Sequence, residues 1–231
     1  MSSFTVLPVQ QRSDAWHLAR LGRVTGSRAS DVLAAIKTGE AAARRDYRLQ
    51  LVCERLTGES QEDTFTSPAM QWGIDHEDEA IGALEAHLGE FIQRTGFLAH
   101  DELMAGASLD GHIGYHFDEV VEVKCPKTAA THVRWLRAGT ITPEHLAQIR
   151  HNVWLTEAKM ATFASYDPRL PDRLRLFVAR TNASNLDLEA YEKALRSFLL
   201  TVDMETEALQ TLATEALQTL ATADPFARMA L

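Results

Sequence analysis

The amino-acid sequence predicts a mixed α/β fold that ends in a long helical segment. Apolar residues recur every three to four positions over residues 67–88, as on one face of an amphipathic helix. A run rich in valine over residues 119–125 predicts a strand. From Leu186 nearly to the end of the chain the pattern is helical. The 231 residues are enough for one domain with a substantial core.

The N-terminal quarter predicts helices joined by polar segments. Residues 13–38 predict a short helix, a turn and a second helix that a serine can cap. Residues 41–56 are strongly helical, and Gly58 follows them as a favourable stop. The polar residues 59–66 predict a loop before the next helix.

The clearest element is the helix over residues 67–88. Ser67 and Pro68 suit its N-cap and first position, and Gly89 suits its end. One face of this helix is formed by Met70, Ile74, Glu77, Ile81, Leu84 and Leu88. Glu77 is the polar member of that face, and a carboxylate there needs a partner. It is either a structural residue paired with an arginine or a backbone amide, or a metal ligand.

The rest of the chain alternates between strands and helices. Strands are expected around Phe97, over 104–109, 119–125, 160–166 and 174–179, with helices over 128–136 and from Thr142-Pro143 onward. The strands at 104–109 and 119–125 form an expected hairpin.

Two carboxylates and a lysine lie close together around that hairpin. Asp110 is expected at the end of the first strand, where Gly111 begins a turn. Glu122 and Lys124 are two positions apart on the second strand, so their side chains share one face. A D…E-x-K pattern is typical of sites that bind a divalent metal and activate water on phosphodiesters. A solvated Glu–Lys pair on a strand face produces the same pattern.

Cysteine and histidine spacing does not predict a zinc site. Cys53 and Cys125 belong to no C-x-x-C motif and are expected to be reduced thiols. His112 and His116 have helical spacing, but the glycines at 111 and 114 predict a loop, so we expect both histidines at the surface.

Charge and hydropathy restrict the classes of partner. The net charge of −9 disfavours broad, non-specific coating of nucleic acid, although a local basic channel remains compatible with it. No apolar run approaches the roughly 20 residues of a membrane span, and the N-terminus lacks the features of a signal peptide. We therefore expect a cytoplasmic protein.

The C-terminal segment contains an identical tandem repeat, EALQTLAT at residues 207–214 and again at 215–222. Eight residues at about 100° each leave the second copy about 80° out of phase, so its leucines drift around the helix. The repeat has no Lys or Arg, which argues against DNA binding there. It is interpreted as a surface or edge helix, with a partner or subunit contact as the alternative.

Several segments, in the right order, match one known family. They are Asp14–His17, Arg20–Ser27, Trp72–Glu77, Ser108–Gly111, Glu122–Pro126, Ala147-Gln148 and Tyr166–Arg169. In these segments the chain resembles the lambda-type phage exonucleases, the YqaJ-like viral recombinases or alkaline exonucleases with a PD-(D/E)xK motif. The family usually has proline before the first motif aspartate, and this chain has Leu109, which affects backbone shape rather than chemistry.

The resemblance implies a restriction-endonuclease-like core, with a mixed central β-sheet flanked by helices. Residues 1–231 would form a single nuclease domain, with 186–231 as its helical extension. The implied activity is Mg²⁺-dependent 5′-to-3′ degradation of the 5′-ended strand of linear double-stranded DNA to mononucleotides. The remaining 3′ overhang would serve a single-strand annealing protein in recombination. The resemblance also implies a homotrimeric ring. The protein would act in the cytoplasm of a bacterial host or be encoded by a prophage.

The resemblance also implies a metal site. Asp110, Glu122 and the main-chain carbonyl of Val123 would hold one Mg²⁺, and Asp110 and Glu77 a second, with Mn²⁺ as a substitute. Lys124 would orient or deprotonate the attacking water.

Four further residues match functional positions of the family. Gln148 matches a glutamine beside the nucleophile, although the residues alone favour an amide on a helix surface. Arg20, Ser27 and Ser108 match positions that bind the terminal 5′-phosphate, and a guanidinium and serine hydroxyls suit that role.

Three other readings stay open at this stage. A PD-(D/E)xK endonuclease or junction resolvase would use the same core, but Arg20, Ser27 and Ser108 argue against it. A non-catalytic DNA-binding scaffold would have no need of the intact carboxylates and lysine. A structural oligomer formed through the C-terminal helix rests on amphipathicity alone.

Overall fold

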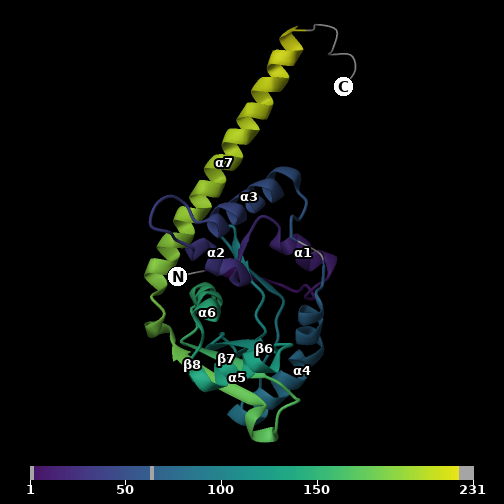
Figure 1. Cartoon of the computed structure of the whole chain (residues 1–231). Coiled ribbons are helices and arrows are strands. Elements are labelled where there is room, and N and C mark those ends of the chain that lie inside the picture. The colour runs from purple at the N-terminus through teal and green to yellow at the C-terminus, as the bar shows by residue number, and fades with distance from the viewer. Residues whose placement is uncertain (1–2, 63–64, 224–231) are drawn as a thin grey trace.

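The computed structural model describes residues 3–62 and 65–223 and shows an α/β body from which one long helix projects (Figure 1). The strands are β1 (Phe4–Leu7), β2 (Val24–Thr25), β3 (Phe97–His100), β4 (Ala105–Ala107), β5 (Gly111–Ile113), β6 (Glu119–Lys124), β7 (Met160–Tyr166) and β8 (Leu176–Asn182). The helices are α1 (Asp14–Arg20), α2 (Ala29–Leu33), α3 (Ala42–Thr57), α4 (Pro68–Leu88), α5 (Ala129–Ala138), α6 (Pro143–Thr156) and α7 (Leu188–Ala223).

The described strands form two mixed four-stranded sheets. One has the order β1-β3-β4-β2, and the other has the order β5-β6-β7-β8. In the second sheet β6 runs parallel to β7 and antiparallel to β5. The parallel neighbour agrees with the burial of β6, in which every residue before Lys124 is buried, because helices cover both faces of such strands. The expected mixed α/β fold is confirmed, and the hairpin partner of β6 is the short strand β5.

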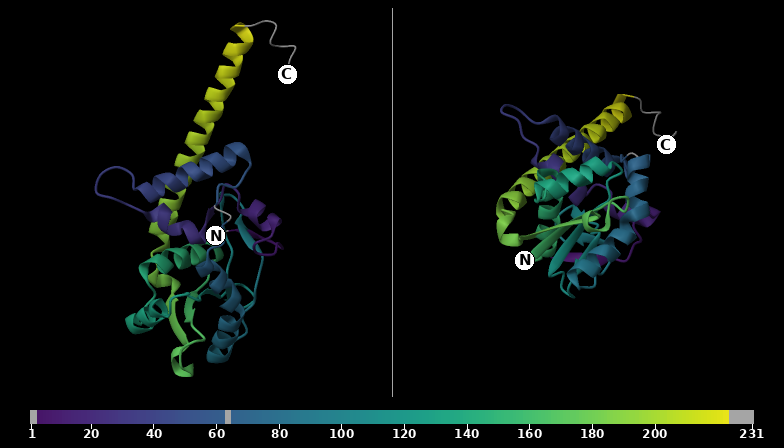
Figure 2. Two further views of the ribbon diagram at one scale, coloured as in Figure 1. Left: turned by 45° about the vertical axis from the view of Figure 1, so that its right-hand side comes forward. Right: turned by 60° about the horizontal axis from the view of Figure 1, so that its bottom comes forward.

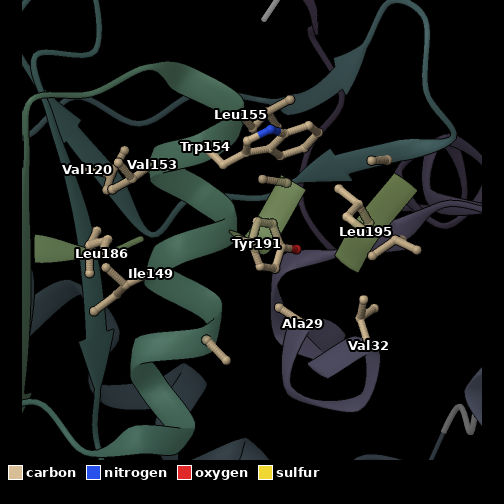
Figure 3. Close-up of a cluster of buried hydrophobic side chains, with 14 of the residues drawn as sticks. Ala29, Val32, Val120, Ile149, Val153, Trp154, Leu155, Leu186, Tyr191 and Leu195 are labelled. Atoms are coloured by element: carbon tan, nitrogen blue, oxygen red, sulfur yellow. The ribbon is translucent and has the colours of Figure 1, made fainter. Parts of the chain in front are cut away.

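Helix α6 lies at the centre of the main hydrophobic core. Figure 3 shows Val153 beside Val120 of β6, Ile149 beside Leu186, and Tyr191 of α7 near Ala29 of α2. The described core side chains from these elements are almost fully excluded from solvent. Burying each large apolar side chain contributes about 1.5–3 kcal/mol, so this contact sets the position of α6 against β6.

A buried histidine fastens α6 to its neighbours. His151 lies 2.6 Å from the hydroxyl of Tyr191 through Nδ1 and 2.9 Å from the carbonyl oxygen of Gly106 through Nε2. Burial lowers the pKa of His151 to about 4, so the ring is neutral. A neutral imidazole can donate to the carbonyl and accept from the phenol, which satisfies both nitrogens.

The helix expected at residues 67–88 is confirmed as α4. The Oγ of Ser67 accepts a hydrogen bond of 3.2 Å from the backbone N–H of Met70. Gly89 follows the helix with φ of +70°, a left-handed conformation that glycine adopts without strain. The expected apolar face is buried only in its C-terminal part, because Met70 is 55% exposed.

One expectation for residues 109–112 needs correction. His112 is not at the surface: it is 5% exposed in β5, where its ring packs 4.1 Å from that of Phe117. Leu109, in the place of the usual proline, is 1% exposed and belongs to the main core. Gly111, one of the two glycines that predicted a loop, instead permits a short, closely packed strand, because a Cβ there would lie 2.3 Å from Ile92.

The two halves of helix α7 differ in their surroundings: the first lies against the body of the protein and the second projects from it (Figure 2). The first half packs on α3, where the rings of Tyr47 and Phe198 stack, and Leu195, Leu199, Val202 and Thr206 of this half are buried. The side chains from 207 to 216 are exposed, which agrees with a surface helix in the first copy of the repeat. The repeat's side chains from 217 onward and residues 224–231 lie outside the described residues. Within the described part of the chain, no helix is long and apolar enough to cross a membrane.

Candidate functional site

Strand β6 places Glu122 and Lys124 side by side at the site. The Nζ of Lys124 donates to Oε1 of Glu122, as expected for residues on one face of a strand. Glu122 is 1% exposed, whereas the Lys124 side chain is 31% exposed. The lysine therefore reaches from a buried carboxylate toward solvent.

Asp110 lies opposite Glu122, immediately before β5 and not at the end of β4. The antiparallel register pairs Gly111 with Val121, so its continuation places Asp110 across from Glu122. The backbone N–H of Val123 donates to Oδ2 of Asp110 over 2.7 Å. This hydrogen bond fixes the carboxylate against the backbone of β6.

Glu77 approaches the same place from α4. Its carboxylate is held by Arg12 at 3.3 Å and by Arg94 at 3.6 Å, and its side chain is 17% exposed. Two cavities of about 430 and 470 Å³ are both lined by Glu77, Asp110 and Arg12. The larger one is also lined by Lys124 and Val123. We call Glu77, Asp110, Glu122 and Lys124 the carboxylate cluster.

The carboxylate cluster has an excess of negative charge. Burial, and then the nearby carboxylate of Asp110, raise the pKa values of both Glu77 and Glu122. Burial alone would lower the pKa of Lys124, but the carboxylates of Glu122, Asp110 and Glu77 outweigh burial and raise it. Lys124 is therefore held as an ammonium ion, which neutralises only part of the negative charge.

The donor set of the carboxylate cluster fits hard divalent cations. Carboxylates and the carbonyl of Val123 offer the oxygen ligands that Mg²⁺ and Mn²⁺ prefer. The three acidic side chains are engaged by Arg12, Val123 and Lys124, and within the described residues no three His, Cys, Asp or Glu side chains form a preformed metal-binding group. A metal bound at Oε1 of Glu122 would compete with the hydrogen bond from Lys124.

A second group of side chains lies beside the carboxylate cluster. The guanidinium of Arg20 lies over the ring of Trp16 at 4.2 Å, and the Nε1 of Trp16 donates to Oγ of Ser108 over 2.7 Å. The Nη2 of Arg20 also donates to Oε1 of Glu62 over 2.7 Å. We call Trp16, Arg20, Glu62 and Ser108 the arginine cluster.

The two clusters come near each other along the chain, because Ser108 is two residues from Asp110. Ser27 adds a second link, since it lines the larger cavity together with Glu77, Asp110 and Lys124. Ser27 lies in a short 3₁₀ turn that follows β2. The structure thus brings Arg20 and Ser108 into contact through Trp16 and places Ser27 on the neighbouring cavity wall.

Asn152 is a residue of the site that sequence reasoning missed. Its Nδ2 donates to Oε2 of Glu122 over 3.4 Å. A Cβ on Gly26 would lie 2.5 Å from Oδ1 of Asn152, so only glycine permits this approach of the turn that carries Ser27. The one available signal was spacing: Asn152 lies one helical turn after Gln148, on the same face of α6. Gln148 is half-buried.

A known protein family matches the part of the chain that carries this site. Residues 15–159 match the model of the YqaJ-like viral recombinase domain. The chain belongs to this family. The matched residues include both clusters in full, from Trp16 to Lys124, and also Asn152.

Solved structures support the assignment of this YqaJ-like chain to the lambda-type exonucleases. LHK-Exo, an alkaline exonuclease from Laribacter hongkongensis, is 32% identical with a TM-score of 0.78. Its structure in complex with dAMP is 33% identical with a TM-score of 0.79. Each match covers 88% of this chain and 100% of the other.

A more distant structure shows the fold alone. A phage-related exonuclease from Haemophilus somnus 129PT is 12% identical with a TM-score of 0.64, over 81% of this chain and 96% of the other. No curated protein sequence matches the chain. The restriction-endonuclease-like fold of this YqaJ-like chain is therefore shared with exonucleases whose sequences have diverged widely.

Proposed function

We propose that this protein is a Mg²⁺-dependent 5′-to-3′ exonuclease that degrades the 5′-ended strand of linear double-stranded DNA. Its products would be mononucleotides and a duplex with a 3′ overhang. The observation that supports this best is the proximity of the two clusters at Ser108 and Asp110: groups suited to hydrolyse a phosphodiester lie near groups suited to hold a terminal phosphate. An exonuclease needs both in one place, because the bound end determines which bond is cut.

The carboxylate cluster supplies the hydrolytic part of the proposal. Asp110 and Glu122, with the carbonyl of Val123, would hold one Mg²⁺, and Asp110 and Glu77 would hold a second. When bound, these ions would stabilise charge on the attacking and leaving oxygens. Mn²⁺ has the same ligand preference and can substitute.

Lys124 and Gln148 would act on the water and the phosphate. Because neighbouring carboxylates raise the pKa of Lys124, its ammonium is better suited to orient water and neutralise phosphate charge than to accept a proton. Asn152 would hold the orientation of Glu122 through its hydrogen bond. Gln148, one turn earlier on α6, would contact the attacking water.

The arginine cluster supplies the end-recognition part. Arg20 and Ser108, joined through Trp16, would bind the 5′-phosphate of the strand being degraded, with Ser27 as a further donor. A guanidinium can form paired hydrogen bonds to a phosphate, and serine hydroxyls add neutral donors. Each cut leaves a new 5′-phosphate, so the same site would bind the shortened strand.

Two assembly properties are proposed with this function. The protein would act as a homotrimer around DNA and would supply 3′ overhangs to a single-strand annealing protein in recombination. A ring is compatible with the net charge of −9, because basic residues can line a channel while the exterior remains acidic. Analytical ultracentrifugation of the full chain would test the trimer.

The function is tested with three duplexes of one sequence: linear with 5′-phosphate, linear with 5′-hydroxyl, and closed circular. Each carries fluorophores that distinguish the two strands, and each is incubated with Mg²⁺ or with EDTA. We expect mononucleotides from the 5′-ended strand of the linear 5′-phosphoryl duplex and no product in EDTA. Asp110→Asn should be inactive, whereas Asp101→Asn, an exposed aspartate outside the cluster, should match the wild type.

Different outcomes would contradict different parts of the proposal. Rapid cutting of the closed circle would favour the endonuclease or resolvase. Tight DNA binding with no cleavage in Mg²⁺ or Mn²⁺ would favour the scaffold. Release of label from the 3′ ends would reverse the strand polarity.

A further inference from the structure

Arg20, the central residue of the arginine cluster, is already paired with an anion. Its Nη2 donates to Oε1 of Glu62 over 2.7 Å. The Arg20 side chain is only 11% exposed, whereas that of Glu62 is 30% exposed. Glu62 comes from the segment between α3 and α4 and approaches Arg20 from the solvent side. The carboxylate thus covers an edge of the guanidinium that a ligand would need.

The pairing leaves part of the Arg20 guanidinium unsatisfied. Among the described residues, none accepts a hydrogen bond from its buried Nε. One face of the guanidinium is covered by the ring of Trp16, and Trp16 in turn holds Ser108. A single carboxylate oxygen uses one donor of a group that has five. An anion with more oxygens could therefore use guanidinium donors that Glu62 leaves unpaired.

We propose that Glu62 occupies the place of the DNA 5′-phosphate and must be displaced by it, so that Glu62 sets how strongly the protein discriminates between DNA ends. The proposal rests on the proposed function, because it assigns a competitor to the same end-binding site. A terminal phosphate has close to two negative charges and three free oxygens, and it can replace a carboxylate on Arg20. A 5′-hydroxyl end has neither, so it leaves the Arg20–Glu62 pair intact.

Glu62 also has a role when the bound 5′-phosphate leaves Arg20. A nearly buried guanidinium without a partner is unfavourable, because it has lost much of its hydration. When Glu62 returns to Arg20, it compensates that charge and lowers the barrier to release of the phosphate. Glu62 would therefore weaken the binding of 5′-phosphoryl ends and shorten the time that they stay bound at the site.

The test is end binding by Glu62→Gln, with Glu59→Gln as the matched control. Glu59 is exposed in the same segment, and the control makes the same change of charge away from Arg20. Dissociation constants are measured in EDTA with a 5′-phosphoryl and a 5′-hydroxyl form of one hairpin duplex. The 3′ end is the same in both forms, so they differ only at the 5′ end. Inorganic phosphate is titrated separately as a competitor.

We expect Glu62→Gln to bind the 5′-phosphoryl hairpin about three- to tenfold more tightly than the wild type, a range reduced for the partial exposure of the pair. Binding of the 5′-hydroxyl hairpin should stay within about twofold, because no group replaces Glu62 there. Inorganic phosphate should compete at lower concentration. Glu59→Gln should behave as the wild type.

Unchanged 5′-phosphoryl binding by Glu62→Gln would overturn the proposal, because Glu62 would then be an ordinary surface partner. Weaker binding would also overturn it, since Glu62 would then position Arg20. Thermal melting checks the fold, and Glu62→Asp, with a shorter side chain, should shift affinity in the same direction if the amide variant misfolds. Equal binding of both hairpins by the wild type would instead show that the proposed end recognition is wrong.

Discussion

The carboxylate cluster and the arginine cluster adjoin each other but are held in different ways. Asp110 is fixed by a backbone N–H of β6, and Glu122 is part of that buried strand. Arg20, in contrast, is held within the described residues by two side chains, the ring of Trp16 and the carboxylate of Glu62. The first cluster is positioned by the sheet and the second by exchangeable side-chain contacts. This difference suits a fixed reaction centre beside a site that must bind and release a strand end.

The largest expected effect is that of Lys124→Ala on the carboxylate cluster. Loss of the ammonium should lower kcat about 10²–10³-fold, because an electrostatic partner of the reacting phosphate is removed. DNA binding in EDTA should be largely retained. Glu122, whose pKa burial and Asp110 already raise, can take up a proton when its partner is lost, so the fold should persist. Lys127→Ala, an exposed lysine three residues later, is the control.

Steady-state kinetics, binding in EDTA and circular dichroism together check this expectation. Turnover by Lys124→Ala close to that of the wild type would remove lysine from the mechanism. The carboxylates would then have to act without the cation that now pairs with Glu122.

Glu77→Gln should separate metal binding from folding. The amide keeps the volume of Glu77 and can still accept from Arg12, so the protein should fold. The rate at saturating DNA should fall about 10–100-fold, and half-maximal activity should need more Mg²⁺. Asp75→Asn, an exposed change on the same helix, is the control.

Glu77→Gln should also change the stability of the folded protein in a defined direction. Burial and Asp110 raise the pKa of Glu77 in the folded protein above its unfolded value. Ionisation therefore costs the folded state stability: the cost is absent below the unfolded pKa and complete above the folded pKa. Without metal, the Gln variant should melt at or slightly above the wild-type temperature near neutral pH. Melting far below it, with an active folded fraction, would make Glu77 a structural residue.

Arg20→Ala tests the arginine cluster without touching the other one. A charge-assisted contact contributes about 1.5–3 kcal/mol, so most of a ten- to hundredfold preference for 5′-phosphoryl over 5′-hydroxyl duplex should be lost. The Mg²⁺ dependence should not change. Rates on the two duplexes, with Arg45→Ala as an exposed control, check this. A changed Mg²⁺ requirement would show that the two clusters are coupled.

The two clusters also differ in how far the sequence could predict them. The spacing of Glu122 and Lys124 on a strand determines their pairing, and the start and end of α4 follow from Ser67, Pro68 and Gly89, because these effects act over a few residues. The contact of Arg20 with Glu62 joins residues 42 positions apart and has no local pattern. Ser27, Arg20 and Ser108 were identified through the family resemblance, and only the fold shows that Trp16 connects two of them.

Errors in the sequence-based predictions have a common physical cause. His112 was expected at the surface because of the nearby glycines, yet Gly111 allows β5 to pack closely against Ile92. Asn152 was missed because an amide within a buried helix has no motif. Short strands and buried polar contacts depend on the tertiary packing around them, which local patterns do not record.

The smallest expected effect is that of Trp16→Phe, which tests the link inside the arginine cluster. Phenylalanine keeps a ring beneath Arg20 but lacks the N–H that donates to Ser108. One hydrogen bond contributes about 0.5–1.5 kcal/mol, so the 5′-phosphate preference should fall about two- to tenfold. Binding of the 5′-hydroxyl duplex should not change.

A double-mutant cycle decides whether that effect belongs to the hydrogen bond. Ser108→Ala removes the acceptor of the same bond, but it also removes a hydroxyl proposed to contact the phosphate, so it should cost at least as much as Trp16→Phe. If Trp16 acts by orienting Ser108, adding Trp16→Phe to Ser108→Ala should cause little further loss. Additive losses would mean that Trp16 acts through its ring on Arg20 alone. The arginine cluster would then consist of two independent contacts, and only the carboxylate cluster would be a connected unit.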